Sequence, residues 1–239
     1  MFAALDPVAI VTRVPVLTEV LAKYAERGDD GLLPAAEEIV HHGHLADYLD
    51  CVAGDGQQNE HNFPVGYRHP NGFTKIRLAR LPGSGWTIRL HLWEPGATDG
   101  DIHDHRWPFA SCVVNGRITE QRYEIADDDG PWTMHDCSPS LNGEFVLAHA
   151  RPCAVRLVAE DSYRSGDSYH RSADALHVAK TADDAPAVTL FIQGPETKTM
   201  TTVLRAPGSA AVSSKPLPMC DSVELQNELR DVLKLMSYA

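Results

Sequence analysis

The sequence lacks the features that would place the protein in a membrane or on a nucleic acid. No stretch approaches the roughly 20 consecutive apolar residues of a membrane-spanning helix, and the start shows no basic segment followed by an apolar core. Lysine and arginine number 21 against 33 acidic residues, which gives a formal net charge of −12 without any basic cluster. Because anionic polymers and lipids attract positive charge, we expect a cytoplasmic protein with a small-molecule partner, no nucleic acid and no membrane.

Cysteine usage and nucleotide motifs are equally sparse. The five cysteines are widely spaced and include no CxxC pair, which argues against a disulfide framework or a zinc knuckle. The signatures GxGxxG, GxxxxGK[ST] and GxSxG are missing as well. Their absence argues against nucleotide binding and serine hydrolase chemistry.

What the chain does contain is enough apolar sequence for one folded domain, at 239 residues and 43% hydrophobic composition. Residues 1–72 are predicted to form an N-terminal cap, with two or three helices between residues 6 and 52 because apolar side chains recur at three- and four-residue spacing. Residues 54–72 are rich in Gly, Asn, Gln and His and are predicted to form a long loop that could cover a site.

Residues 73–206 offer many short segments rich in β-branched and aromatic residues, separated by turn sequences such as Asp127–Gly130, which is predicted to be a hairpin turn. This pattern predicts an all-β sandwich or barrel with enough strands for a double-stranded β-helix. Residues 207–239 are predicted to form a linker and a C-terminal helix, packed on the barrel or on a second subunit. A homodimer is plausible on base rates alone.

Two HxH patterns occur among twelve histidines, and chance alone yields about one. His42-Gly43-His44 falls in the predicted helical region and is interpreted as the chance occurrence. His103-Asp104-His105 instead follows a Gly/Asp-rich turn and leads into a β-prone run that ends at Asn115-Gly116. In a strand, residues two apart point to the same face, so both imidazoles are expected side by side in the barrel interior.

Further residues of one recognisable pattern surround this HxH: Gly96, Gly100, Ile102–His105, Gly116, Ala175–Val178 and Ala187–Ile192. On these residues the sequence from Lys75 to Gly194 resembles the cupin superfamily, and within it the thiol dioxygenases such as cysteine dioxygenase. The resemblance implies a mainly β cupin barrel in which the HxH pair and a third histidine bind Fe(II), so that the protein would be a cupin oxygenase or dioxygenase acting on a small molecule and O₂.

Two histidines are candidates for the third ligand position. His177 lies between Leu176 and Val178, the alternation expected of a strand with one polar inward residue, whereas His170 lies in a loop-like stretch. We therefore expect metal ligands His103, His105 and His177.

Most cupins place a glutamate four or five residues after the HxH, where this sequence has Phe109 or Ala110. A site of three neutral histidines would leave the metal dipositive, with open positions for water, substrate and O₂. Zn, Mn or Ni are alternatives to Fe(II), in a non-oxidative lyase, isomerase or hydrolase. A ligand-binding protein without turnover is a third reading.

Substrate-binding candidates follow in part from the resemblance. Arg77 stands at the distance ahead of the HxH where thiol dioxygenases have an arginine for the substrate carboxylate, although an outward arginine is an equal alternative. Arg89 and His91 share one face of a predicted strand with Trp93, and the pattern does not decide which face is internal. The remaining predicted substrate-binding residues are Trp107, Phe109 and Tyr169, and Trp93, Trp107 and Phe109 together would suit an aromatic or otherwise apolar substrate.

The thiol dioxygenases also carry a Ser-His-Tyr relay in their last barrel strand. Here the matching positions are Thr189, Phe191 and Gln193. No acid/base residue is therefore assigned, and the missing relay argues against cysteine as the substrate.

Overall fold

The computed structural model describes residues 15–54, 64–69, 71–139, 145–182, 184–209 and 218–237. Most of the predicted covering loop, including His61, lies outside the described residues. The helices are α1 (Pro15–Ala25), α2 (Leu32–His41), α3 (His44–Gly54) and α4 (Ser222–Ser237), with a 3₁₀ turn η1 (Gly28–Gly31). The strands are β1 (Val65–His69), β2 (Phe73–Arg80), β3 (Thr87–Trp93), β4 (Ile102–His103), β5 (Phe109–Asn115), β6 (Arg117–Pro139), β7 (Phe145–Arg164), β8 (Ser168–Arg171), β9 (Leu176–Thr181), β10 (Ala187–Gln193) and β11 (Thr201–Arg205).

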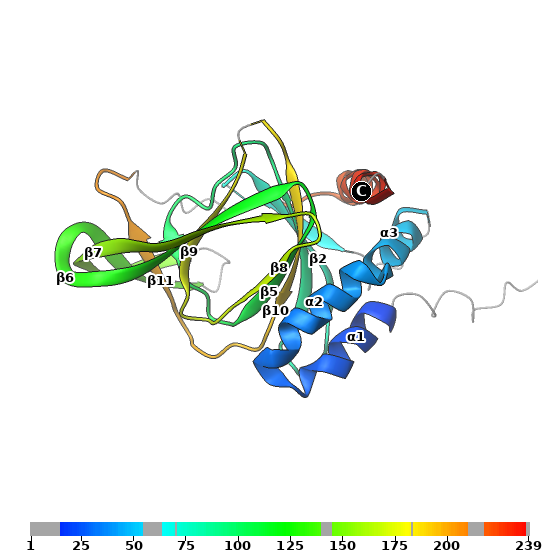
Figure 1. Cartoon of the computed structure of the whole chain (residues 1–239), viewed down its shortest axis with the longest axis horizontal. Coiled ribbons are helices and arrows are strands. Elements are labelled where there is room, and N and C mark those ends of the chain that lie inside the picture. The colour runs from blue at the N-terminus through cyan, green and yellow to red at the C-terminus, as the bar shows by residue number, and fades with distance from the viewer. Residues whose placement is uncertain are drawn as a thin grey trace, which may run out of the picture.

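The strands form two antiparallel sheets whose order defines the fold (Figure 1). The first sheet has the order β1-β2-β3-β10-β5-β8, and the second has β11-β4-β9-β6-β7. Strands β3 to β10 thus contribute β3-β10-β5-β8 to one sheet and β4-β9-β6-β7 to the other, which is the strand order of a jelly roll. The predicted fold class, a mainly β double-stranded β-helix with helices at both ends, is confirmed.

The helices cover the outer face of the first sheet (Figure 1). Ile88 and Leu90 of β3 and Leu190 of β10 are fully buried there, in one apolar cluster with side chains from all four helices. Because side chains alternate along a strand, the other face of β3 points into the space between the sheets. The structure thereby resolves the open alternative: Arg89, His91 and Trp93 occupy the inner face.

The C-terminal helix packs on its own chain. The N–H groups of Val223 and Glu224 donate to the Asp221 carboxylate, and Glu224 accepts the Asp221 N–H in return, which forms a capping box. Leu225 and Leu229 are buried in the same cluster as the other helices, and α4 lies against α3. Of the two predicted locations, the structure shows packing on the protein itself, and the homodimer stays a prediction.

The ribbon of β6 and β7 is much longer than the sequence pattern predicts. Near its start, β6 pairs with β9; toward its far end it pairs with β11, so the ribbon curls back on the second sheet. The bend lies where the register shifts between Asp127 and Trp132. The predicted hairpin turn at Asp127–Gly130 is therefore wrong, because Asp and Gly also suit a bulge that bends a continuing strand.

This curled ribbon encloses a second apolar cluster on the back of the strands that carry the histidines. Ile102, Leu176 and Val178 are buried in it and alternate with His103 and His177 along β4 and β9. Burial of these apolar neighbours on one face fixes both imidazoles on the other, between the sheets.

Two strands were missed by the sequence analysis. β1 falls in the predicted covering loop, and β8 falls in the stretch read as loop-like around His170. Both lie at the ends of the first sheet and are short, so they carry too few residues for a recognisable alternation.

The predicted domain boundaries stay predictions. None of the described helices is long and apolar enough to cross a membrane.

Candidate metal centre

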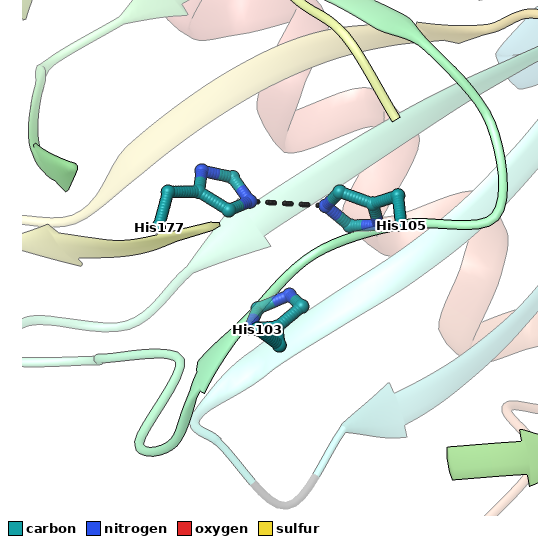
Figure 2. A group of neighbouring side chains, drawn as sticks. All are labelled: His103, His105 and His177. Atoms are coloured by element: carbon teal, nitrogen blue, oxygen red, sulfur yellow. Dashed lines mark hydrogen bonds between the residues drawn. The ribbon is translucent and has the colours of Figure 1, made fainter. Parts of the chain in front are cut away.

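The three histidines expected to bind metal converge between the two sheets (Figure 2). His103 of β4 and His177 of β9 are direct cross-strand partners, and His105 follows His103 along the chain. Their ring centroids lie 5.0 Å (His103–His105), 5.2 Å (His103–His177) and 5.1 Å (His105–His177) apart. One ring nitrogen of each lies within 4.8 Å of the other two.

His105 reaches this point from a loop and not from a strand, contrary to the sequence prediction. β4 ends at His103, and the chain then crosses to the other sheet, where β5 begins at Phe109. The middle residue, Asp104, is buried and anchors the crossing segment: it accepts the Thr202 N–H at 2.7 Å and a hydrogen bond from the Lys198 ammonium. Both imidazoles therefore face inward while the carboxylate between them holds the backbone.

Hydrogen bonds orient two of the three rings. His103 Nδ1 lies 3.1 Å from the Asp101 carbonyl oxygen, and His177 Nδ1 lies 2.8 Å from Glu120 Oε1. A carbonyl and a carboxylate only accept, so each Nδ1 carries the proton and donates. Each Nε2 therefore keeps its lone pair, which on His177 faces His105 Nε2, as in metal-binding histidines whose other nitrogen is held by a protein acceptor.

The carboxylate of Glu120 is fully buried and is shared between His177 and Arg171. Arg171 donates to it through Nε at 3.0 Å and through a second guanidinium nitrogen, and also donates to the Tyr163 hydroxyl at 2.8 Å. Burial alone would raise the pKa of Glu120, but the hydrogen bonds from His177 and Arg171 lower its pKa below the ordinary value. Glu120 is therefore ionised at neutral pH and holds the His177 ring.

Glu120 was missed by the sequence analysis. The sequence feature that could have indicated Glu120 is its position two residues after Ile118 in a β-prone segment. This spacing places both side chains on one face of the strand. That the face is internal depends on the pairing of β6 with β9, which no local pattern reveals.

The geometry of the nitrogens fits a metal ion. His105 Nε2 and His177 Nε2 lie 3.0 Å apart, as the dashed line in Figure 2 marks. Two nitrogens bound about 2.1 Å from one ion at a right angle would also be about 3.0 Å apart. Burial lowers the pKa of His103 and of His105, so both rings are neutral and can coordinate at physiological pH. The donor set of three imidazoles suits Fe, Zn, Ni or Cu.

No carboxylate joins this group among the described residues. Phe109 stands where the cupin pattern has glutamate, and its fully buried ring lies 4.9 Å from the His105 ring and 5.4 Å from the His177 ring. An apolar ring thus packs against two of the imidazoles. His170, the alternative third ligand, is not part of the group.

The predicted substrate-binding residues are only partly brought together. The Trp107 ring stacks 6.0 Å from that of His105, and the Arg89 guanidinium lies 5.7 Å from the Trp107 ring. His91 is buried beside Phe191 at 5.0 Å. Arg89 and His91 therefore lie on the inner face of β3, and Trp107 lies beside His105 in the segment between β4 and β5.

Tyr169 and Arg77 are placed differently. Tyr169 is buried against Phe109 and stacks on Tyr163 at 4.3 Å, so it packs behind the site. Arg77 is exposed at the end of the inner face of β2, opposite Arg89. The roles of both in substrate binding stay predictions.

The positions that match the missing relay serve packing and orientation. Thr189 accepts the indole N–H of Trp93 at 3.2 Å, and Gln193 accepts a hydrogen bond from Arg89. Phe191 joins the aromatic cluster with Phe109. None of these three side chains is a general acid or base.

Lys75 is a further inner-face residue that the sequence analysis did not select. It is the cross-strand partner of His91, two residues from Phe73, and its side chain is partly buried. Burial, together with a smaller effect of the nearby Arg89, lowers the pKa of Lys75 to about 8. Its ammonium forms no hydrogen bond or ion pair with any described residue.

The other HxH also has an acidic neighbour. His42 and His44 lie near Glu38 on the outer helices, with His42 exposed. Glu38 already accepts from the Lys23 ammonium at 2.5 Å and from the Tyr24 hydroxyl at 2.6 Å. An ammonium group against the carboxylate disfavours a cation there, and we assign no site to this group.

Comparisons with known proteins give distant structural similarity only. No family model and no curated protein matches the sequence. Among solved structures, the chain is similar to a hydroquinone 1,2-dioxygenase in complex with Cd²⁺ and 4-hydroxybenzonitrile (13% identity, TM-score 0.34, 51% of this chain and 63% of that chain). An RmlC-like cupin from Shewanella frigidimarina (15%, 0.34, 59% and 91%) and a cupin superfamily protein from Desulfitobacterium hafniense (10%, 0.32, 54% and 83%) are similarly distant. At these TM-scores no activity is inferred from them.

The buried charge of Lys75 makes a testable contribution to stability. The folded pKa of about 8 lies below the ordinary 10.5. Below pH 8 the lysine is charged in both states, and the folded protein bears the cost of burying that charge. Between pH 8 and 10.5 only the unfolded chain keeps the proton, so the wild type gains stability as pH rises.

We therefore expect Lys75→Met to raise the free energy of unfolding at pH 7 by about 1–3 kcal/mol, with the advantage vanishing as pH approaches 10.5. Urea unfolding at several pH values measures this, with Lys234→Met, an exposed lysine of α4, as the unchanged control. A Lys75→Met protein less stable than the wild type at pH 7 would contradict the prediction.

Proposed function

We propose that this protein is a mononuclear non-haem Fe(II) oxygenase that acts on a small organic molecule. The observation that carries the proposal is the convergence of three imidazoles in the interior of a jelly roll, with the Nδ1 of two of them held by protein acceptors. When bound, Fe(II) supplies open coordination positions and redox chemistry with O₂. Zn, Mn and Ni are the alternative metals, and a metal-dependent lyase, isomerase or hydrolase is the alternative reaction class.

The residues of the chain have distinct tasks in this proposal. His103, His105 and His177 hold the metal, and Glu120 keeps the proton of His177 on Nδ1. Phe109 excludes a carboxylate and water from one side of the group. With three neutral ligands the centre keeps its double positive charge, which favours a substrate that brings an anionic donor.

Metal content is the first test of the centre. The protein is loaded anaerobically with Fe(II), freed of excess metal and analysed by inductively coupled plasma mass spectrometry. We expect near-stoichiometric iron in the wild type and in His170→Ala, and loss of iron from His103→Ala and His177→Ala. Iron retained by both ligand variants, or none bound by the wild type, would overturn the site.

The same samples distinguish the reaction classes. O₂ uptake with a panel of small organic acids should require Fe(II) and should be absent from Zn(II)-loaded protein. Turnover supported by Zn(II) without O₂ consumption would instead establish the non-oxidative alternative.

The Glu120 carboxylate gives a second prediction. Glu120→Gln keeps the shape but removes the charge that holds His177 Nδ1–H, so we expect metal affinity to fall about 10- to 100-fold. Competition with a chromophoric chelator measures this loss. Glu160→Gln, a substitution of a half-exposed carboxylate on the adjacent strand β7, is the matched control and should bind metal like the wild type. Unchanged affinity in Glu120→Gln would show that the carboxylate does not support the centre.

A further inference from the structure

Three nitrogen groups, on β2, on β3 and in the segment between β4 and β5, have no hydrogen-bond partner among the described residues. His91 Nε2 and Trp107 Nε1 are buried without one. The Lys75 ammonium also forms no hydrogen bond or ion pair there and lies 5.7 Å from the centroid of the Phe73 ring. Buried polar atoms are almost always satisfied in folded proteins, so the two buried nitrogens indicate a missing partner, and the unpaired ammonium on the strand next to His91 can bind a negative charge on it.

These groups surround the same part of the interior. Lys75 and His91 face each other across β2 and β3. Burial lowers the pKa of His91, His103 and His105, and the nearby charge of Lys75 adds to this lowering. The Trp107 ring stacks on the His105 ring with 6.0 Å between centroids. The unsatisfied donors and the three-histidine group are thus neighbours.

The charge of this region is positive. Lys75 and Arg89 both lie on the inner face, and the proposed metal would add two further charges. Glu120 is already shared between His177 and Arg171. Asp99 attracts Lys75 electrostatically, but its carboxylate accepts the Ala179 N–H at 2.9 Å and makes no hydrogen bond to the lysine. An ammonium and an indole N–H can only donate, so the missing group is an acceptor with negative charge.

The surroundings of these donors are aromatic. Phe73 packs on Trp93 at 4.4 Å between ring centroids, and Phe191 packs on Phe109 at 4.6 Å and beside His91. A ligand that reaches Lys75 and the metal ligands would therefore contact ring faces as well as charges.

We propose that Lys75, His91 and Trp107 bind the carboxylate of an aromatic or otherwise apolar organic acid, which is the substrate class of this site. The inference deepens the proposed function and rests on it for the metal beside the carboxylate. Lys75 supplies the charge, and the N–H of Trp107 and the free nitrogen of His91 fix the orientation. The low pKa of Lys75, about 8, still leaves the ammonium protonated at pH 7.

Benzoate and its neutral analogue benzamide are the probes. Their binding is measured by isothermal titration calorimetry at pH 7 on metal-free and on Zn(II)-loaded protein, for the wild type, Lys75→Met, Trp107→Phe and the control Lys234→Met. Methionine has nearly the volume of lysine and phenylalanine keeps an aromatic ring, so both variants keep the packing. Circular dichroism and zinc content are recorded for each.

We expect benzoate to bind the wild type more tightly than benzamide, and Lys75→Met to weaken benzoate binding at least about tenfold in both metal states. Trp107→Phe should give a smaller loss, while Lys234→Met and the zinc content of all variants stay unchanged. Equal affinity for benzoate and benzamide, no binding of either, or wild-type benzoate affinity in Lys75→Met would overturn the proposal.

The two proposals fail separately in this experiment. If all variants bind zinc and the affinity for benzoate does not depend on Lys75, the metal centre stands and the carboxylate site is rejected. Benzoate binding that depends on Lys75 in a protein that takes up no metal would reject the metal centre and keep the carboxylate site.

Discussion

The site depends on one buried interaction, the Glu120 carboxylate held between His177 and Arg171. Glu120 lies on β6 and His177 on β9 of the second sheet, whereas Arg171 lies on β8 of the first. The ion pair therefore joins the two sheets at the depth of the histidines. A fully buried carboxylate is costly unless its oxygens are satisfied, and here both oxygens are bonded. Loss of this ion pair would free the His177 ring and would also remove a link that holds the two sheets at their spacing.

The two faces of each sheet have separate tasks. The outer face of the first sheet packs on four helices, and the back of the second sheet packs on the curled β6–β7 ribbon. These apolar layers bury hydrophobic side chains on the outer faces of both sheets. The space between the sheets can then hold groups that reduce stability, such as the partly buried Lys75 and the unsatisfied nitrogen of His91. Proteins keep such groups mainly at functional sites.

The short alternating segments of the sequence predict a β sandwich or barrel, and the resemblance to the cupins, together with local patterns, predicts which three histidines converge. Alternation around His177 places it on a strand face, and the HxH spacing keeps His103 and His105 together. The sequence does not predict that β4 ends at His103, because the crossing of the chain between sheets depends on the anchoring of Asp104 by the distant Thr202 and Lys198. It likewise does not select Glu120 or Lys75, whose inward direction is set by strand register.

The most direct test of the account is X-ray absorption spectroscopy at the iron edge of the Fe(II)-loaded protein. The account predicts scattering from three imidazole rings at ordinary Fe–N distances, with no sulfur in the first shell, since the free cysteines described are not part of the histidine group. The remaining ligands should be light atoms, nitrogen or oxygen. Sulfur coordination, or fewer than two imidazole rings on the iron, would contradict the three-histidine centre.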